Sequence, residues 1–180
     1  MSHAVLIQNV AQATQLDSLN RFAKSASADI DNGNIFYLAS KSSATGEGEV
    51  WLATQPATGA LKFSLRLLNT TYISIADGSI GNQRVTAYEF EVVDNSSNLW
   101  MAYEPEVVVT ISGSNKFKGI DHDVRNFTNL QGDVFSAFKP IDGDILTVTA
   151  DGLTGTKSTN TFVVATNGAY TLAWAASANS

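Results

Sequence analysis

Between residues 61 and 67 apolar and polar side chains alternate without a break, and this segment constrains the fold more than any other in the chain. The order is Leu61, Lys62, Phe63, Ser64, Leu65, Arg66 and Leu67. A repeat of two is typical of an antiparallel strand with one face on the core and the other in water. The sequence therefore predicts a sheet that covers a hydrophobic core with one of its faces.

Further strand signals extend over most of the remaining chain. Apolar runs rich in β-branched and aromatic residues occupy 34–39, 49–54, 72–76, 84–93, 99–103, 107–111, 145–150, 161–166 and 170–174. Turn pairs such as Asp77-Gly78 and Asn167-Gly168 separate several of these runs, and the second pair predicts a hairpin. Val85 and Ala87 are out of phase with Phe90, so we expect a β-bulge near Ala87.

A single segment predicts a helix. From Thr14 to Ala23 the apolar residues Leu16, Leu19 and Phe22 fall on one helical face, and Thr14 with Asp17 resembles a capping box. The predicted fold class is therefore all-β or β-dominated α+β, built as an antiparallel sandwich or barrel with one short N-terminal helix. At 180 residues the chain is long enough to bury a substantial core.

The N-terminal segment leaves two interpretations open. It is apolar, β-branched and without helical spacing, which favours an extended conformation. It is either an assembly arm that adds a strand to a neighbouring subunit or the first strand of its own sheet, because both use the same main-chain hydrogen bonds. The candidate arm residues are Ala4, Val5, Leu6, Ile7 and Val10. Residues 1–12 are thus an arm or a first strand, and residues 13–180 form a single β-rich domain.

Charge and composition narrow the range of partners. Only 16% of the residues are charged and the net charge is −6, so the surface should be polar and largely neutral, which suits a protein that packs against neighbours. Binding to nucleic acid depends on Lys and Arg, so an acidic chain does not favour it. No stretch approaches the ~20 apolar residues of a membrane helix, and the N-terminus lacks the basic start of a signal peptide. We expect no nucleic-acid or membrane partner, and synthesis in the cytoplasm.

Two acidic segments invite a metal or catalytic interpretation. In Asp121-His122-Asp123 an imidazole lies between carboxylates, which could bind a divalent cation or hold a general base. On a strand His122 would face away from both neighbours, so a polar loop is favoured. Asp29 to Asn34 resembles the start of a calcium loop, but Gly33 and Ser40 stand where that loop needs oxygen ligands. This second segment predicts an ordinary turn.

The chain has no cysteine, and it contains no nucleophile elbow, phosphate loop or dinucleotide fingerprint. We therefore expect no enzyme, no cofactor and no metal, although a pair of catalytic carboxylates would leave no local signature and stays open. Trp51, Trp100 and Trp174 could form a sugar-stacking platform. Because each lies in an apolar run, packing in the core or at a subunit interface is favoured.

Several short segments spread over the chain carry a family resemblance. They are Leu16 to Asn20, Asp31 to Asn34, Gly46 to Trp51, Asn98 to Trp100, Pro105 to Val108, Arg125 to Asn129, Phe138 to Pro140 and Gly143 to Thr147. Taken together they look like small virion proteins of tailed bacteriophages, which have a similar length, lack cysteine and serve as head decoration, cement or fibre components. Residues 69–93 have no counterpart in this resemblance, which predicts an insertion at that place.

The resemblance implies a location and a partner. A protein of this kind is expected in the virion, where it binds the major capsid protein as a homo-oligomer and stabilises the head. A receptor- or carbohydrate-binding β-module on the virion is the alternative. That alternative requires exposed aromatic side chains close to Asn, Asp or Gln.

Overall fold

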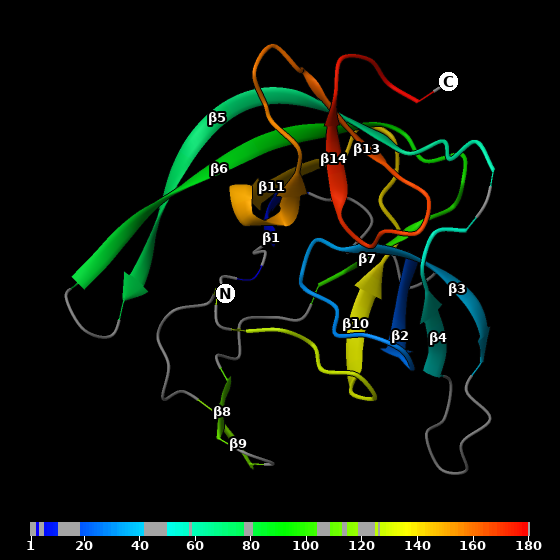
Figure 1. The fold of residues 1–180 in the computed structure, drawn as a ribbon, viewed down its shortest axis with the longest axis vertical. Helices are drawn as coiled ribbons and strands as arrows, with labels where there is room; N and C mark the ends of the chain where they lie inside the picture. Colours follow the sequence, from blue (N-terminus) through cyan, green and yellow to red (C-terminus); the bar gives the residue numbers. More distant parts are fainter. Residues whose placement is uncertain are drawn as a thin grey trace.

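The computed structural model describes residues 3, 6–10, 19–41, 50–57, 59–77, 81–103, 109–112, 115–118, 125 and 127–179. Over these ranges the chain is nearly all β, with a short 3-10 turn at Ala150–Gly152 (Figure 1). The strands are β1 (Leu6–Val10), β2 (Asn20–Ser25), β3 (Ile35–Lys41), β4 (Val50–Thr54), β5 (Ser64–Asp77), β6 (Gly81–Asp94), β7 (Trp100–Ala102), β8 (Val109–Ser112), β9 (Asn115–Lys118), β10 (Val134–Phe138), β11 (Ile145–Thr149), β12 (Leu153–Thr154), β13 (Phe162–Ala165) and β14 (Leu172–Ala175).

The strands form a curled seven-stranded sheet and a closed five-stranded barrel. The sheet has the order β1-β11-β6-β5-β13-β14-β12 and is antiparallel except for the β12–β14 pair. The barrel has the order β10-β2-β4-β3-β7, with β2 and β4 parallel and its other pairs antiparallel. β8 and β9 make a separate two-stranded hairpin. The predicted β class is confirmed.

Three neighbouring barrel strands, β3, β7 and β10, separate two hydrophobic cores. One core fills the space between the barrel and the sheet, and the other fills the barrel. Consecutive residues on each of these strands face opposite cores, as the pairs Ile35 and Phe36, Met101 and Ala102, and Phe138 and Ala137 show, each with the residue of the sheet core first. Successive strand side chains point to opposite faces, so the positions between the two cores are apolar on both sides. Beyond the sheet core, β10 carries the partly buried Ser136 on its outer face.

The predicted alternation at residues 61–67 holds with one exception. Leu61, Phe63 and Leu65 are buried in the sheet core. Ser64 is also fully buried. Its hydroxyl is satisfied there, because it accepts a hydrogen bond from the backbone N–H of Asn179 at 2.8 Å. The Asn179 side chain donates to the Ala165 carbonyl at 3.0 Å. Asn179 therefore lies against the sheet.

The predicted N-terminal helix is wrong for the residues that the structure describes. Residues 20–23 belong to β2, which lies between β4 and β10, and residues 14–18 lie outside the described ranges. Phe22 is 61% exposed, whereas the adjacent Ala23 is completely buried in the barrel. Such a reversal between neighbours fits a strand and not one face of a helix. The helical spacing of Leu16, Leu19 and Phe22 requires Phe22 to be a core residue, and Phe22 is exposed.

The hairpins agree with the turn residues in the sequence. β13 and β14 pair antiparallel around the turn that contains Gly168, whose φ of 74° is the left-handed conformation that glycine adopts without strain.

The β-bulge expected near Ala87 of β6 lies on the partner strand β5 instead. The β5–β6 register shifts between Leu67 and Asn69, opposite Phe90 and Glu89. Leu68 is therefore the extra residue that allows the hairpin to bend.

Replacing Phe135 with alanine tests the barrel core. Its ring packs edge-on against Phe36, with centroids 5.7 Å apart and planes at 88°. We expect Phe135→Ala to lower the free energy of unfolding by about 3–5 kcal/mol, because a cavity remains in a closed barrel. Phe22→Ala, the same change at an exposed site, should cost about 1 kcal/mol or less. Urea denaturation measures both, and equal losses would contradict the described barrel interior.

Candidate functional site

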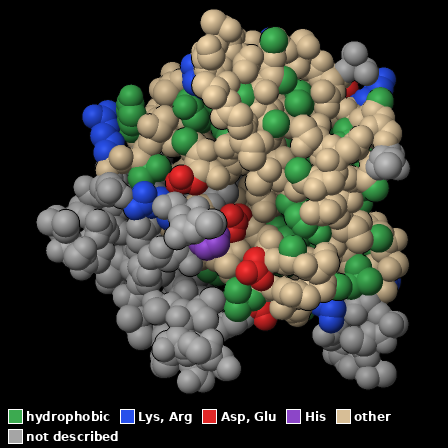
Figure 2. All heavy atoms as spheres, viewed as in Figure 1, with side chains coloured by type: hydrophobic (Ala, Val, Ile, Leu, Met, Phe, Trp, Pro, Cys, Tyr) green, Lys and Arg blue, Asp and Glu red, His purple; other side chains and the backbone are tan. Residues whose placement is uncertain are grey.

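The surface of the described chain is largely uncharged. Figure 2 shows one face on which Lys, Arg, Asp and Glu side chains are sparse among neutral atoms. Within the described ranges, four large apolar side chains are exposed, Phe22, Leu68, Tyr72 and Val134. Two of them lie on the outer wall of the barrel and two on the long β5–β6 hairpin. These two surfaces are the candidate functional sites.

The first surface is the outer wall of the barrel along β2 and β10. Phe22 is paired with Ser136, and Val134 lies two residues before Ser136 on the same outward face. Phe22 and Val134 are 61% and 47% exposed. They lie on this side of the barrel because β2 packs against no further layer of the described structure. Two apolar side chains thus share one outer face of the barrel.

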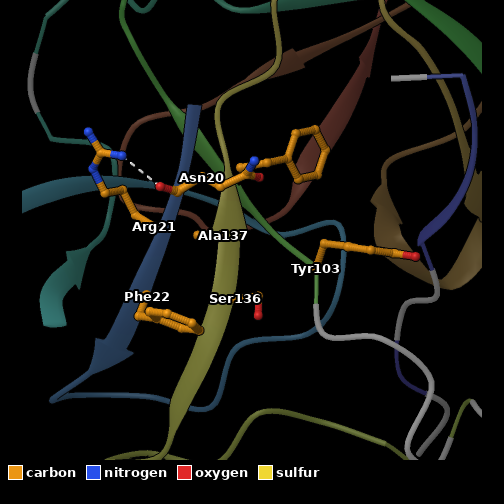
Figure 3. A pocket seen from close by; sticks show the side chains of 7 residues that line it. Asn20, Arg21, Phe22, Tyr103, Ser136 and Ala137 are labelled. Carbon is orange, nitrogen blue, oxygen red and sulfur yellow. Dashed lines mark hydrogen bonds between the residues drawn. The ribbon is translucent and has the colours of Figure 1, made fainter. Parts of the chain in front are cut away.

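A groove of about 510 Å³ lies beside these residues. It is lined by Asn20, Arg21, Phe22, Tyr103, Ser136, Ala137 and Phe138. Figure 3 shows Phe22 and Ser136 side by side on the two strands, with Tyr103 at the end of β7 across from them. The Tyr103 backbone N–H donates to the Ser136 carbonyl at 3.0 Å, and its ring packs edge-on against Phe138. The aromatic groups of the groove are therefore positioned by main-chain pairing.

Arg21 lies at the margin of the groove and points away from Tyr103 (Figure 3). Its guanidinium donates to the Asn20 carbonyl at 2.7 Å and lies 5.7 Å from the centroid of the Trp100 ring. Cation–π contacts of this kind stabilise a guanidinium over an indole. Arg21 therefore belongs to the barrel wall beside Trp100.

The second surface is the outer part of the β5–β6 hairpin, which we call the ribbon and define as residues 69–77 and 81–86. β5 pairs with β13 only at residues 64–66, and β6 pairs with β11 only at residues 87–91. Beyond these points the two strands pair only with each other among the described strands. Figure 1 shows the hairpin crossing the molecule and its end extending beyond the other strands of the sheet.

One aromatic contact organises the ribbon surface. Tyr72 is 53% exposed, and the Arg84 guanidinium lies 4.2 Å from the centroid of its ring. The contact runs diagonally across the two strands, since Tyr72 pairs with Thr86 and Ser74 with Arg84. Arg84 therefore holds the tyrosine ring at the ribbon surface without covering it fully.

The candidate arm residues are only partly within the described structure. Leu6, Ile7 and Val10 lie in β1, which pairs with β11 as the first strand of the sheet order. Ala4 and Val5 lie outside the described ranges. Within this chain the segment is thus an edge strand, and its use as an arm toward a neighbour stays a prediction.

Only one of the two acidic segments lies within the described residues. Asp121-His122-Asp123 lies outside the described residues. The other segment forms the predicted turn, in which the Asn34 N–H donates to the Asp31 carbonyl at 3.0 Å and Gly33 has a φ of 88°. The Nδ1 atom of His3 lies 2.9 Å from Asp31 Oδ1. In the described part of the chain, no group of three or more His, Asp or Glu residues is arranged to hold a metal ion.

The three tryptophans are half-buried at separate places. Trp174 packs on the sheet core with its ring edge-on to Tyr88 at 5.0 Å, and Trp100 packs against the barrel core. Trp51 has the Lys41 ammonium 5.6 Å from its ring centroid. No ring contact joins any two of them in the residues described. The described aromatic surfaces are formed by other residues.

Sequence reasoning missed Phe22, Tyr103 and Tyr72 as surface residues. Phe22 was assigned to the apolar face of a helix, and Tyr72 lies in an apolar run that predicts a strand without indicating an exposed face. Only the pairing of distant strands decides which side of such a strand is exposed.

Comparison of the chain with protein-family models, with curated proteins and with solved structures finds no match. Within the described ranges, no helix has the length and apolar character needed to cross a bilayer.

A turn beside the barrel contains a titratable group with a shifted pKa. The Ser96 hydroxyl donates to Asp94 Oδ1 at 2.6 Å, the Ser96 backbone N–H donates to the same atom at 2.8 Å, and Lys62 adds an attractive charge. Led by the hydroxyl, these contacts hold the pKa of Asp94 below its ordinary value against a smaller opposing effect of burial. The next residue, Asn95, is buried and donates to the carbonyls of Leu99 and Pro140 at 2.9 and 2.7 Å.

The Asp94 contacts predict a pH-dependent stability. A carboxyl whose pKa is lower in the folded state stabilises the fold above its unfolded pKa, and this contribution is lost as the pH falls through the folded value. We expect Ser96→Ala to raise the pKa of Asp94 and to destabilise the protein more at pH 7 than near pH 2. Nuclear magnetic resonance titration measures the pKa of Asp94, and urea unfolding at pH 7 and near pH 2 measures the free energy of unfolding.

The matched control is Ser27→Ala, the same substitution at an exposed serine in the segment after β2. This variant should show no pH-dependent difference in the free energy of unfolding, because its hydroxyl does not contact Asp94. A Ser96→Ala effect of equal size at both pH values would contradict the assignment.

Proposed function

We propose that this chain is a structural component of a bacteriophage particle that binds the major capsid protein as a homo-oligomer and stabilises the head. The resemblance of its short segments to small virion proteins supports the phage assignment. The single structural observation that carries the binding part is the position of β1. This strand ends the sheet, with β11 on one side and no described strand on the other.

An open sheet edge offers a row of main-chain donors and acceptors to another chain. Strand addition to such an edge combines hydrogen bonds with contacts of alternate side chains, and it is a common mode of recognition between proteins. In the proposed complex an extended segment of the capsid protein pairs with β1, or the 1–12 segment leaves its own sheet and pairs with the capsid. Both use the residues Leu6–Val10.

The neutral surface supports this function. The chain contains 11 basic and 17 acidic residues in 180, so the charge density is low and like-charge repulsion between tightly packed copies is weak. A decoration protein must place many copies side by side on a shell. A surface of amides and hydroxyls allows such packing through hydrogen bonds.

A receptor- or carbohydrate-binding module on the virion is a second candidate, and the groove on the barrel favours it. Phe22 and Tyr103 supply aromatic faces, and Asn20 lies at the same groove. Sugar rings stack on aromatic faces and use amides for hydrogen bonding. In this case Phe22→Ala should weaken binding to purified polysaccharide of the host envelope about tenfold or more, while capsid binding stays unchanged.

The capsid proposal is tested by mixing purified protein with capsids that lack it. The capsids are assembled from the major capsid protein of the phage that encodes the chain, and binding is followed by co-sedimentation and electron microscopy. We expect saturable binding at regular positions on the shell. Absence of any association would overturn the proposal.

Truncation separates the role of β1 from that of the rest of the molecule. Removal of residues 1–12 should weaken capsid binding at least tenfold, because it removes the edge strand. Removal of residues 1–2 is the control and should leave binding unchanged. Circular dichroism and thermal unfolding verify that both variants fold. If the longer truncation folds and still binds as well as the full chain, the arm has no role in capsid binding.

A further inference from the structure

Among the described residues, nothing pairs with the outer edge of β5 over a long stretch of the ribbon. From Asn69 to Asp77 this strand pairs with β6 on one side, and no described strand pairs with it on the other. The last described main-chain bond on that side is the one from the Leu67 N–H to the Thr161 carbonyl at 2.8 Å. In an antiparallel strand alternate residues turn their N–H and C=O groups to opposite edges. Every second residue of 69–77 therefore presents main-chain groups without a described partner along this edge.

The sequence of this edge lacks the features that prevent pairing. Natural edge strands are protected by Lys, by Pro, by short length or by bulges. Residues 69–77 read Asn-Thr-Thr-Tyr-Ile-Ser-Ile-Ala-Asp, with no Lys and no Pro. The one bulge of the region, at Leu68, precedes the ribbon and leaves the register regular from Asn69 to Asp77. Thr, Tyr and Ile are residues that strands favour, so this edge is suited to accept a further strand.

Charge placement identifies a second copy of the same strand as the partner. If two β5 edges pair antiparallel around a two-fold axis at Ile73, Asp77 lies opposite Asn69, and no like charges face each other. The β6 edge does not allow this. Its open part, residues 81–86, is shorter and carries Arg84 near its middle, so self-pairing would bring two guanidinium groups together. The β5 edge is therefore the self-complementary one.

We infer that two copies of this protein associate through the β5 edges of their ribbons and form one continuous antiparallel four-stranded ribbon. The two-fold axis passes through the Ile73 pair. Tyr72 lies opposite Ser74 of the second copy, so the two Tyr72 residues occupy diagonal positions roughly 7–8 Å apart, which is within reach of aromatic side chains. The exposed position of Tyr72 and the Arg84 contact that holds its ring fit this arrangement.

The pairing also explains why so long a ribbon forms. A two-stranded hairpin without further support is only marginally stable in water, whereas three or more strands stabilise one another. The second copy supplies the additional strands. The inference goes beyond the capsid proposal and does not rest on it, because the free protein in solution tests it.

The absence of cysteine makes a direct test possible. Ile73→Cys places one thiol of each copy at the two-fold axis, where paired Cα atoms lie about 4.5–5.5 Å apart, within the range of a disulfide. Gln83→Cys is the control on β6, where the two thiols would be separated by three strand spacings, about 14 Å, and by a further offset along the strands, because Gln83 pairs with Ile75. We expect oxidation to convert most of the Ile73→Cys protein to covalent dimer and little of the Gln83→Cys protein. Equal dimer formation by both variants, or none by either, would overturn the inference.

Charge substitution gives an independent measurement without a cross-link. Thr70→Lys combined with Ser74→Lys places four added positive charges near the two-fold axis of the dimer. Asn82→Lys combined with Thr86→Lys adds the same charges to the same face of the ribbon, on β6. Analytical ultracentrifugation should show a wild-type dimer, at least tenfold weaker association for the β5 variant, and a retained dimer for the β6 variant. A monomeric wild type, or equal weakening of both variants, would refute the pairing.

Discussion

The fold depends on one wall of strands that is buried on both sides. Between the two cores, β3, β7 and β10 carry apolar residues at consecutive positions, so that Ile35 faces the sheet core and Phe36 faces the barrel core. Neither core can close without this wall, because each of its strands contributes to both. The constraint explains why the parts of these strands between the two cores are apolar at consecutive positions instead of alternating. The wall also connects the barrel and the sheet, because its strands contribute to both cores.

Buried amides and hydroxyls fix the loops around this unit. Asn129 donates to the Ile30 carbonyl at 2.8 Å, and its backbone forms an isolated bridge with the same residue. Asn95 links the turn after β6 to Pro140, and Ser64 holds the C-terminal residues through Asn179. A buried polar group that loses its partner costs free energy, so such contacts specify one arrangement of the loops. These contacts are hydrogen bonds between neutral groups.

The exposed apolar side chains and strand edges lie where the described sheet and barrel have no further layer or strand against them. The outer face of β2 and β10 exposes Phe22 and Val134 beyond the sheet core, and the part of the hairpin beyond the sheet exposes Tyr72. The edges of β1 and β5 carry main-chain groups without described partners. Surfaces of this kind are available for contacts between proteins, and both proposed roles, capsid binding and self-association, use sheet edges for recognition.

Local patterns in the sequence determined the β class, the side-chain alternation at 61–67, the turn at Gly33 and the hairpin around Gly168, because side-chain alternation and glycine conformations depend only on neighbouring residues. Tertiary structure alone decided that residues 20–23 form a strand. It also brought Phe22 and Tyr103 to one groove and left the β5 edge without a described partner strand. The physical reason is that a strand acquires its buried face, and a sheet its edges, from partners far away in the chain. A pattern with a period of two describes the strand but does not name the partner.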